Sequence, residues 1–296
     1  VIPENDVADA YNERALVHFG RGEYQEALAL LKVAIARRDA MHDSSSVQRG
    51  VLLTQMTVTL RSLGRNAEAM AALEESVAVL SRNLPESRAN YATSLGNLGT
   101  FMVSDGRAEE GNAKLKEALY QLSLLKPERT PILLAITRNH AMSLRELGRF
   151  DEADREYAAL LVRQREFFGE HHVEIARTLH AIAQTRLVEQ RWDEAEHALD
   201  EAEAVERALG NTHDPRLLAY QADRARIHIA RSEYQAAVDL LAPVLAERDR
   251  GVFSERSYAD AERAAMAYAQ CRIAPDPELA DRILELTGSL DERQMR

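Results

Sequence analysis

Gly22-Glu23-Tyr24-Gln25-Glu26-Ala27 decides the fold, because related hexapeptides recur along the chain at a constant spacing. Its copies begin at residues 64, 106, 148, 190 and 232, each 42 residues after the one before. The copies at Gln190 and Ser232 are weaker and lack the leading glycine. One further step reaches Ala274, just before Asp276-Pro277-Glu278-Leu279. A register kept through six intervals predicts an array of about seven structural repeats.

Each repeat has the pattern of two helices, when positions are counted from the leading residue of the hexapeptide, here called the anchor. Small residues stand seven positions before the anchor and, except for Leu279 in the last repeat, five positions after it, which would let two helices approach closely. A large apolar residue stands nine positions after it. The anchor glycine favours the left-handed conformation that ends a helix. Alternating strand patterns are absent from the sequence. The three sets are Ala15, Thr57, Gly99, Ala141, Ala183, Ala225 and Ala267; Ala27, Ala69, Gly111, Ala153, Ala195, Ala237 and Leu279; and Leu31, Leu73, Leu115, Tyr157, Leu199, Leu241 and Ile283.

The sequence therefore predicts an all-α solenoid in a single domain over residues 1–296. Its units are expected at about residues 5–46, 47–88, 89–130, 131–172, 173–214, 215–256 and 257–290. Turns within the helix pairs are expected near residues 20–23, 62–65, 104–107, 146–149, 188–191 and 230–233. The last helix is expected to close the array as a cap, because it carries the polar residues Asp281, Arg282 and Glu285.

The anchor pattern Gly-x-Tyr/Phe/Trp-x-Glu-Ala, with its small-residue positions, resembles the tetratricopeptide repeat. A period of 42 residues is similar to the kinesin-light-chain subtype of that family. Motifs of this subtype are matched by Phe168-Gly169-Glu170-His171-His172-Val173, by residues 209–215 and by Leu95-Gly96-Asn97-Leu98-Gly99. The resemblance covers about residues 5–288. It implies a right-handed α-solenoid whose first helices line a concave groove.

The composition excludes several classes of protein. Among 296 residues, 48 acidic side chains outnumber 37 basic ones, and the net charge is −11. An acidic balance argues against nucleic acid as a partner, because phosphate recognition uses a basic surface. A single cysteine, Cys271, excludes an internal disulfide. No apolar run approaches the length of a membrane span, so we expect no membrane insertion.

The chain begins at Val1 and shows no signal peptide, so we expect a piece of a longer protein or a processed chain. Of the 37 basic residues, 33 are arginine, which is typical of a GC-rich bacterial genome. We expect a cytoplasmic protein, or a periplasmic one if the chain is part of a membrane-anchored protein.

Candidate catalytic and metal-binding residues do not form a recognisable motif. His171 and His172 are adjacent, and no His-Glu-x-x-His or Cys-x-x-Cys spacing occurs. Trp192 shares its position with Tyr24, Phe150 and Tyr234, so we expect it to pack between helices. We therefore expect no catalytic residue, no metal ion and no cofactor, and a chain that is not an enzyme by itself.

Positions 13, 10, 6 and 3 before the anchor share one face of the first helix in each repeat. In the middle repeats this face has no acidic residue, and it carries Arg138, Arg145, Arg177, His180, Gln184 and Arg226. In the N-terminal repeats it includes Leu16, Phe19, Val58 and Val103. We predict that the arginines hold carboxylates of a partner, because the guanidinium fork suits them. The alternative is that they pair with glutamates of the second helices.

The resemblance to the kinesin-light-chain subtype implies that Asn97 and Asn139 are groove asparagines that bond the backbone of a bound segment. Ala181, Asp223 and Ala265 replace this asparagine in later repeats. The lysine and asparagine of chaperone-tail clamps are replaced by Asp9 and Glu13. A clamp of that type is therefore not expected.

These features predict a scaffold that binds a protein or peptide in its groove, with an acidic segment as the candidate ligand. Two alternatives remain open. The array could be the regulatory or sensor segment of a multidomain enzyme, such as a bacterial Ser/Thr kinase, or it could be an oligomerisation module. Residues upstream of Val1 would separate them, and the oligomeric state is left open.

Overall fold

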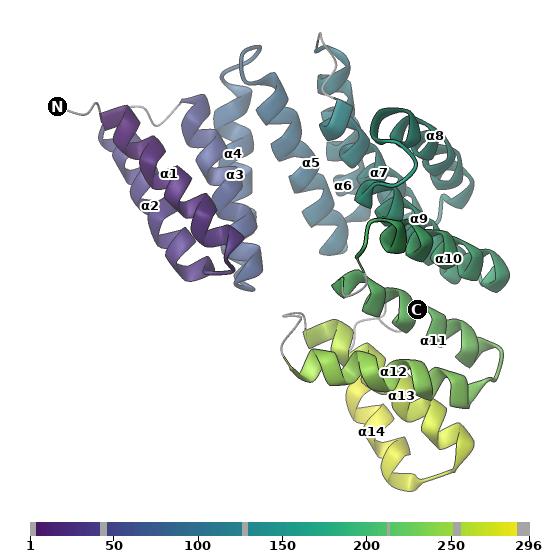
Figure 1. Ribbon diagram of the computed structural model, residues 1–296. Helices are drawn as coiled ribbons and strands as arrows, with labels where there is room; N and C mark the ends of the chain where they lie inside the picture. Colours follow the sequence, from purple (N-terminus) through teal and green to yellow (C-terminus); the bar gives the residue numbers. More distant parts are fainter. Residues whose placement is uncertain (1–3, 42–45, 126–129, 212–213, 251–255, 289–296) are drawn as a thin grey trace. The chain divides into compact units, whose positions relative to one another are not determined.

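The computed structural model describes residues 4–41, 46–125, 130–211, 214–250 and 256–288. Every regular element within these ranges is an α-helix, and no strand occurs among them (Figure 1). This confirms the predicted all-α fold. None of the described helices is long and apolar enough to cross a membrane. The helices are α1 (Glu4–Gly20), α2 (Tyr24–Ala40), α3 (Val47–Ser62), α4 (Asn66–Ser81), α5 (Arg88–Ser104), α6 (Ala108–Ser123), α7 (Thr130–Glu146), α8 (Phe150–Phe168), α9 (Val173–Val188), α10 (Trp192–Ala208), α11 (Pro215–Ala230), α12 (Tyr234–Asp249), α13 (Arg256–Ile273) and α14 (Pro277–Gly288).

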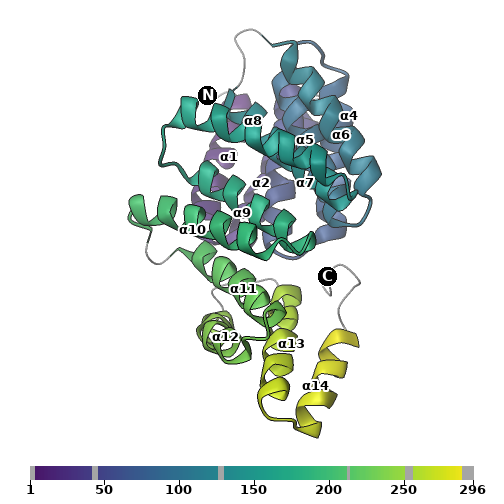
Figure 2. The ribbon, with the colours of Figure 1, turned by 90° about the vertical axis from the view of Figure 1, so that its right-hand side faces the viewer.

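Hairpin packing joins paired helices, and Figures 1 and 2 both show α1 beside α2 and α13 beside α14. The pairs in contact are α1–α2, α3–α4, α5–α6, α9–α10, α11–α12 and α13–α14. Each of the six predicted turns coincides with the gap between two paired helices. The first gap, for example, lies between Gly20 and Tyr24. The 42-residue register therefore places the helix ends correctly.

In the first six hairpins, the anchor residue after the first helix adopts the left-handed conformation. Gly22 has a φ of 76°, and two backbone hydrogen bonds close its turn. Glu23 N–H donates to His18 O at 3.0 Å, and Gly22 N–H donates to Phe19 O at 3.0 Å. These are the two bonds of the Schellman motif, which satisfies carbonyl groups at the end of a helix.

The fifth and sixth repeats keep this turn without glycine. Gln190 and Ser232 have φ values of 59° and 63°. Their turns retain the hydrogen bond that closes the motif, with Arg191 N–H donating to Arg186 O at 2.9 Å in the fifth repeat. A side chain in this conformation is strained relative to glycine. The hairpin therefore imposes the turn where the sequence does not favour it.

The small residues mark the closest approach of paired helices, as predicted. A Cβ atom added to Gly99 would lie 2.7 Å from the carbonyl oxygen of Gly111, and one added to Gly111 would lie 2.5 Å from that of Gly99. Helices α5 and α6 therefore touch through their backbones. In other repeats the same positions are buried alanines, among them Ala15, Ala27, Ala141, Ala153, Ala183 and Ala195.

Residues 1–156 and 157–296 form two compact units, and the division falls within α8. The core of the first unit includes Leu80, Leu95 and Leu115. That of the second includes Leu199, and Trp192 packs against this core, as the sequence predicted. The organisation as a single domain stays a prediction.

The last hairpin, α13–α14, differs from the others. Asp281, Arg282 and Glu285 are exposed on α14. However, Leu284 is also exposed, and Ile283 is only half-buried although its counterparts in earlier repeats are buried. The capping role of this helix stays a prediction.

Candidate binding surface on the first helices

We call the set of positions 13, 10, 9, 6 and 3 before the anchor the first-helix face. In the first unit it lies on α1, α3, α5 and α7, and in the second on α9, α11 and α13. Neighbouring first helices are in contact. Thr54 on α3 and Ser94 on α5 are joined by a hydrogen bond of 2.8 Å. A Cβ atom on Gly96 of α5 would lie 2.8 Å from the side chain of Ile136 on α7.

The two groove asparagines implied by the resemblance are half-buried on α5 and α7. Asn139 Nδ2 donates to Thr100 Oγ1 at 3.0 Å, and Thr100 Oγ1 donates in turn to Gly96 O at 2.8 Å. These two hydrogen bonds in series fix the amide of Asn139 across the two helices. It uses one N–H of that amide and leaves its carbonyl oxygen able to accept a hydrogen bond. Asn97 lies one repeat earlier in the equivalent position.

The four apolar residues of the N-terminal repeats divide into two pairs. Leu16 and Val58 are each 44% exposed. Phe19 is half-buried and packs on Tyr24, with ring centroids 5.3 Å apart. Val103 is half-buried against the core of the first unit. Leu16 and Val58 are therefore the accessible apolar contacts of the face.

The two candidate arginines of the first unit, Arg138 and Arg145, both interact with other groups of the protein. Arg145 Nη2 lies 2.7 Å from Glu146 Oε1, its neighbour in the sequence, and the Arg145 side chain is largely buried. Arg138 is half-buried on α7 and also has partners. Neither arginine presents an open guanidinium.

The two candidate arginines of the second unit, Arg177 and Arg226, are more exposed to solvent. The Arg177 side chain is 49% exposed and pairs with Glu174. The Arg226 side chain is 43% exposed, and its Nη1 lies 3.4 Å from Asp223 Oδ1. In both pairs the carboxylate precedes the arginine by three residues on the same helix. The alternative interpretation correctly predicted that these arginines pair with carboxylates of the chain itself. However, Glu174 and Asp223 lie on first helices rather than on second helices.

His180 is the centre of a polar cluster between α9 and α11. Its Nε2 lies 2.8 Å from Asp223 Oδ2 and 3.4 Å from Gln184 Nε2. The ring meets Tyr220 edge to face, with centroids 4.8 Å apart. Burial raises the pKa of the Tyr220 hydroxyl above its usual range, and the nearby carboxylate of Glu206 adds to this effect.

The structure thus brings together His180, Gln184 and Arg226 but adds a residue that sequence reasoning missed as a partner. Asp223 appeared only as a departure from the asparagine pattern. It lies 43 residues after His180, which is one repeat plus one residue. That spacing is the signal that could have placed the two on neighbouring first helices.

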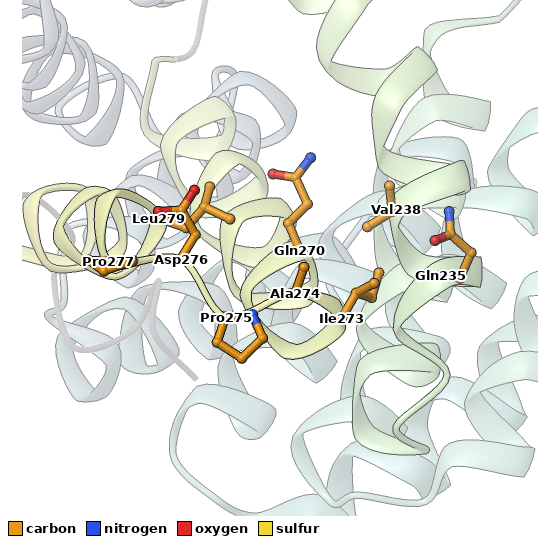
Figure 3. Close-up of a pocket in the computed structure, with 9 residues that line it drawn as sticks. All are labelled: Gln235, Val238, Gln270, Ile273, Ala274, Pro275, Asp276, Pro277 and Leu279. Atoms are coloured by element: carbon orange, nitrogen blue, oxygen red, sulfur yellow. The ribbon is translucent and has the colours of Figure 1, made fainter.

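A surface pocket of about 570 Å³ lies away from these residues, between α12, α13 and the turn into α14 (Figure 3). Its lining is mainly apolar, with amide groups from Gln235 and Gln270. The remaining lining residues are Val238, Ile273, Ala274, Pro275, Asp276, Pro277 and Leu279.

Among the described residues, no group of three or more His, Cys, Asp or Glu side chains could hold a metal ion.

Comparison with known proteins agrees with this geometry. The family model described as the tetratricopeptide repeat matches residues 6–82 and 133–204. No curated protein matches the chain significantly.

Several solved structures share the fold at low identity. The nearly identical repeats of a kinesin-light-chain-type protein from Podospora anserina are 20% identical, with a TM-score of 0.57, and cover 72% of this chain and 100% of that one. BtubC (BKLC) from P. vanneervenii is 16% identical, with a TM-score of 0.59, and the match covers 74% of this chain and 90% of that one. The apo form of RapI is 11% identical, with a TM-score of 0.69, and the match covers 97% of this chain and 98% of that one.

Proposed function

Because the chain belongs to the tetratricopeptide repeat family, we propose that it is a non-catalytic scaffold that binds an extended segment of a partner protein along its first-helix face. Repeat arrays of this type offer extended surfaces for binding. The observation that carries the proposal is the fixed amide of Asn139, which bonds to Thr100 and keeps its carbonyl oxygen able to accept a bond. An amide held in this way can pair with the backbone of a bound chain.

The partner is proposed to carry acidic residues, and the second unit offers the best contacts for them. Arg177 and Arg226 are the accessible arginines of the face. A guanidinium has five N–H donors, so an arginine already paired along its own helix can still donate to a second carboxylate. The contribution of Arg145 is expected to be small, since its side chain is largely buried against Glu146.

Apolar side chains of the partner are proposed to contact the first unit. Leu16 and Val58 stand at the same position of consecutive first helices and are equally exposed. Burying such side chains contributes roughly 25 cal/mol for each Å² of apolar surface removed from water. The partner is therefore expected to offer apolar residues to the first unit and acidic residues to the second.

Selection from a random peptide library displayed on phage tests this proposal. The wild-type chain should enrich acidic sequences, and Arg177→Glu combined with Arg226→Glu should abolish that enrichment. The matched control is Arg207→Glu, because Arg207 is exposed on the second helix α10. Enrichment of acidic sequences that survives the double reversal, or no enrichment by the wild type, would contradict the acidic contact.

A further inference from the structure

Several first helices share a second set of contacts, made with the preceding repeat. Positions 12, 8, 5 and 1 before the anchor form what we call the backward face. At these positions Leu52 packs with residues of α2, Phe101 with residues of α4, and Ile136 with residues of α6. The backward face of each of these first helices is therefore covered by the second helix of the preceding hairpin.

On α11 the backward face binds an acidic helix through two arginines. Arg224 Nη1 lies 2.6 Å from Glu203 Oε2, and its Nη2 lies 2.6 Å from Asp200 Oδ1. Arg231 makes the same double contact one step along α10. Its Nη1 lies 2.7 Å from Glu196 Oε2, and its Nη2 lies 2.5 Å from Asp193 Oδ1.

Apolar packing accompanies these ion pairs. Tyr220 and Ile227, which alternate with the two arginines on the backward face of α11, are each 1% exposed. They belong to the same core cluster as Ala198 and Ala202 of α10. The α10–α11 contact is therefore a small apolar seam flanked by four charge-assisted bonds.

Helix α1 repeats three of the four positions of the α11 pattern, and no described helix covers them. Arg14 and Arg21 stand at the positions of Arg224 and Arg231, and Val17 stands at that of Ile227. In the sequence, only these two first helices have arginine both 8 and 1 positions before the anchor. Val17 is 54% exposed, and both arginines are exposed.

Neither Arg14 nor Arg21 has a side-chain partner among the described residues. We propose that the backward face of α1, formed by Ala10, Arg14, Val17 and Arg21, is a docking surface for an acidic α-helix of a partner protein. The partner helix carries carboxylates at positions i, i+3, i+7 and i+10, as α10 does with Asp193, Glu196, Asp200 and Glu203. This surface is separate from the first-helix face, so the two binding proposals stand independently.

A second copy of this chain does not provide the required helix. In the sequence, no second helix other than α10 has more than two carboxylates at the four corresponding positions. The carboxylates of α10 itself are already bound by Arg224 and Arg231. The charge pattern therefore argues against a homodimer formed through the second helices of residues 1–296.

A synthetic peptide with the sequence of residues 192–208 provides a direct probe. A hydrocarbon staple between positions 197 and 201 would hold the peptide helical. Neither position is one of the four carboxylates, and both His197 and Glu201 are exposed in the protein. Binding to the full chain would be measured by fluorescence anisotropy. We expect saturable binding that weakens as salt is raised, because exposed charge pairs are screened.

Matched variants locate the binding. Arg14→Glu with Arg21→Glu should weaken binding at least about tenfold, as expected for lost charge pairs at an interface. Arg82→Glu is the control, because Arg82 is exposed at the end of α4 and outside this surface. A peptide with amides in place of the four carboxylates should also bind at least about tenfold more weakly. The proposal would be overturned if the wild type showed no saturable binding, if binding survived the double reversal with the fold intact by circular dichroism, or if the amide peptide bound equally well.

Discussion

His180 on α9 and Asp223 on α11 are joined across two neighbouring first helices, with Nε2 of the histidine 2.8 Å from Oδ2 of the aspartate. The same carboxylate lies 3.4 Å from Nη1 of Arg226 through its other oxygen. Asp223 is itself buried. One carboxylate therefore positions two of the candidate binding side chains in the second unit.

Replacing this carboxylate should destabilise the second unit. Asp223→Ala leaves His180 without its carboxylate partner, and hydrogen bonds to charged groups contribute about 1.5–3 kcal/mol each. We expect the free energy of unfolding to fall by an amount in that range, measured by urea denaturation. Asp239→Ala is the control, because Asp239 is exposed and accepts a bond from Gln235 on its own helix. An equal loss in both variants would contradict the structural role of Asp223.

Glycine at the two strained turns should stabilise the protein. Ser232 and Gln190 adopt the left-handed conformation, which costs a residue with a side chain about 1–2 kcal/mol. Part of the gain is lost because glycine increases the entropy of the unfolded chain. We therefore expect Ser232→Gly to raise the free energy of unfolding by about 0.5–1 kcal/mol. Gly148→Ala, at a turn with a φ of 70°, should have the opposite effect, and a change of the same sign in both variants would contradict this reasoning.

A buried amide on α8 should be replaceable by leucine with a gain in stability. Gln164 is fully buried, and neither of its amide atoms has a hydrogen-bond partner among the described residues. Leu80 and Leu122 stand at the same position of earlier repeats. An unsatisfied buried polar group costs about 1–3 kcal/mol, so Gln164→Leu should raise the midpoint of thermal unfolding.

The control for this substitution is Asn112→Leu. The Asn112 amide is also buried, but it donates to Ser143 Oγ at 2.8 Å. Leucine at this position removes a satisfied bond and should destabilise the protein. If Gln164→Leu lowered the midpoint as Asn112→Leu does, the unsatisfied state of Gln164 would be refuted.

Stability at high pH should depend on Tyr91. Burial, together with the hydrogen bond to Glu117 at 2.8 Å, raises the pKa of the Tyr91 hydroxyl to about 12. The unfolded chain releases this proton near pH 10, whereas the folded chain keeps it, so its contribution to stability is present below about pH 10 and is lost as the pH rises to about 12. Tyr91→Phe should therefore make the fall in stability over this interval shallower. The exposed residue Tyr120 gives the control, since Tyr120→Phe should leave the slope unchanged. An unchanged slope in Tyr91→Phe would contradict the raised pKa.

The fold could be read from the sequence because its determinants recur. The anchor glycines and the small residues that bring α5 and α6 into contact are local features with a fixed period, so the helix ends follow from them. The left-handed turns at Gln190 and Ser232 could be placed only through that period, because neither residue favours the conformation.

The candidate site was less predictable, because ion pairs depend on neighbours outside the chosen positions. Glu174 and Asp223 lie three residues before their arginines, at positions that were not counted as part of the arginine-bearing face. Arg14 and Arg21, which have no side-chain partner in the described ranges, also could not be recognised from one repeat. A docking role for these two arginines can be inferred only when α1 is compared with α11, whose arginines bind the carboxylates of α10.

Site-specific cross-linking of a selected peptide tests the central claim, that a partner segment binds along the first helices. A photoreactive phenylalanine analogue would be placed at Val58 on α3, which is 44% exposed, and in a second variant at Val33 on α2, which is 38% exposed. Both positions lie in the first unit, so they differ mainly in the helix that carries them. The account predicts an efficient cross-link from position 58 and little or none from position 33. An efficient cross-link from position 33 with none from position 58 would contradict binding along the first-helix face.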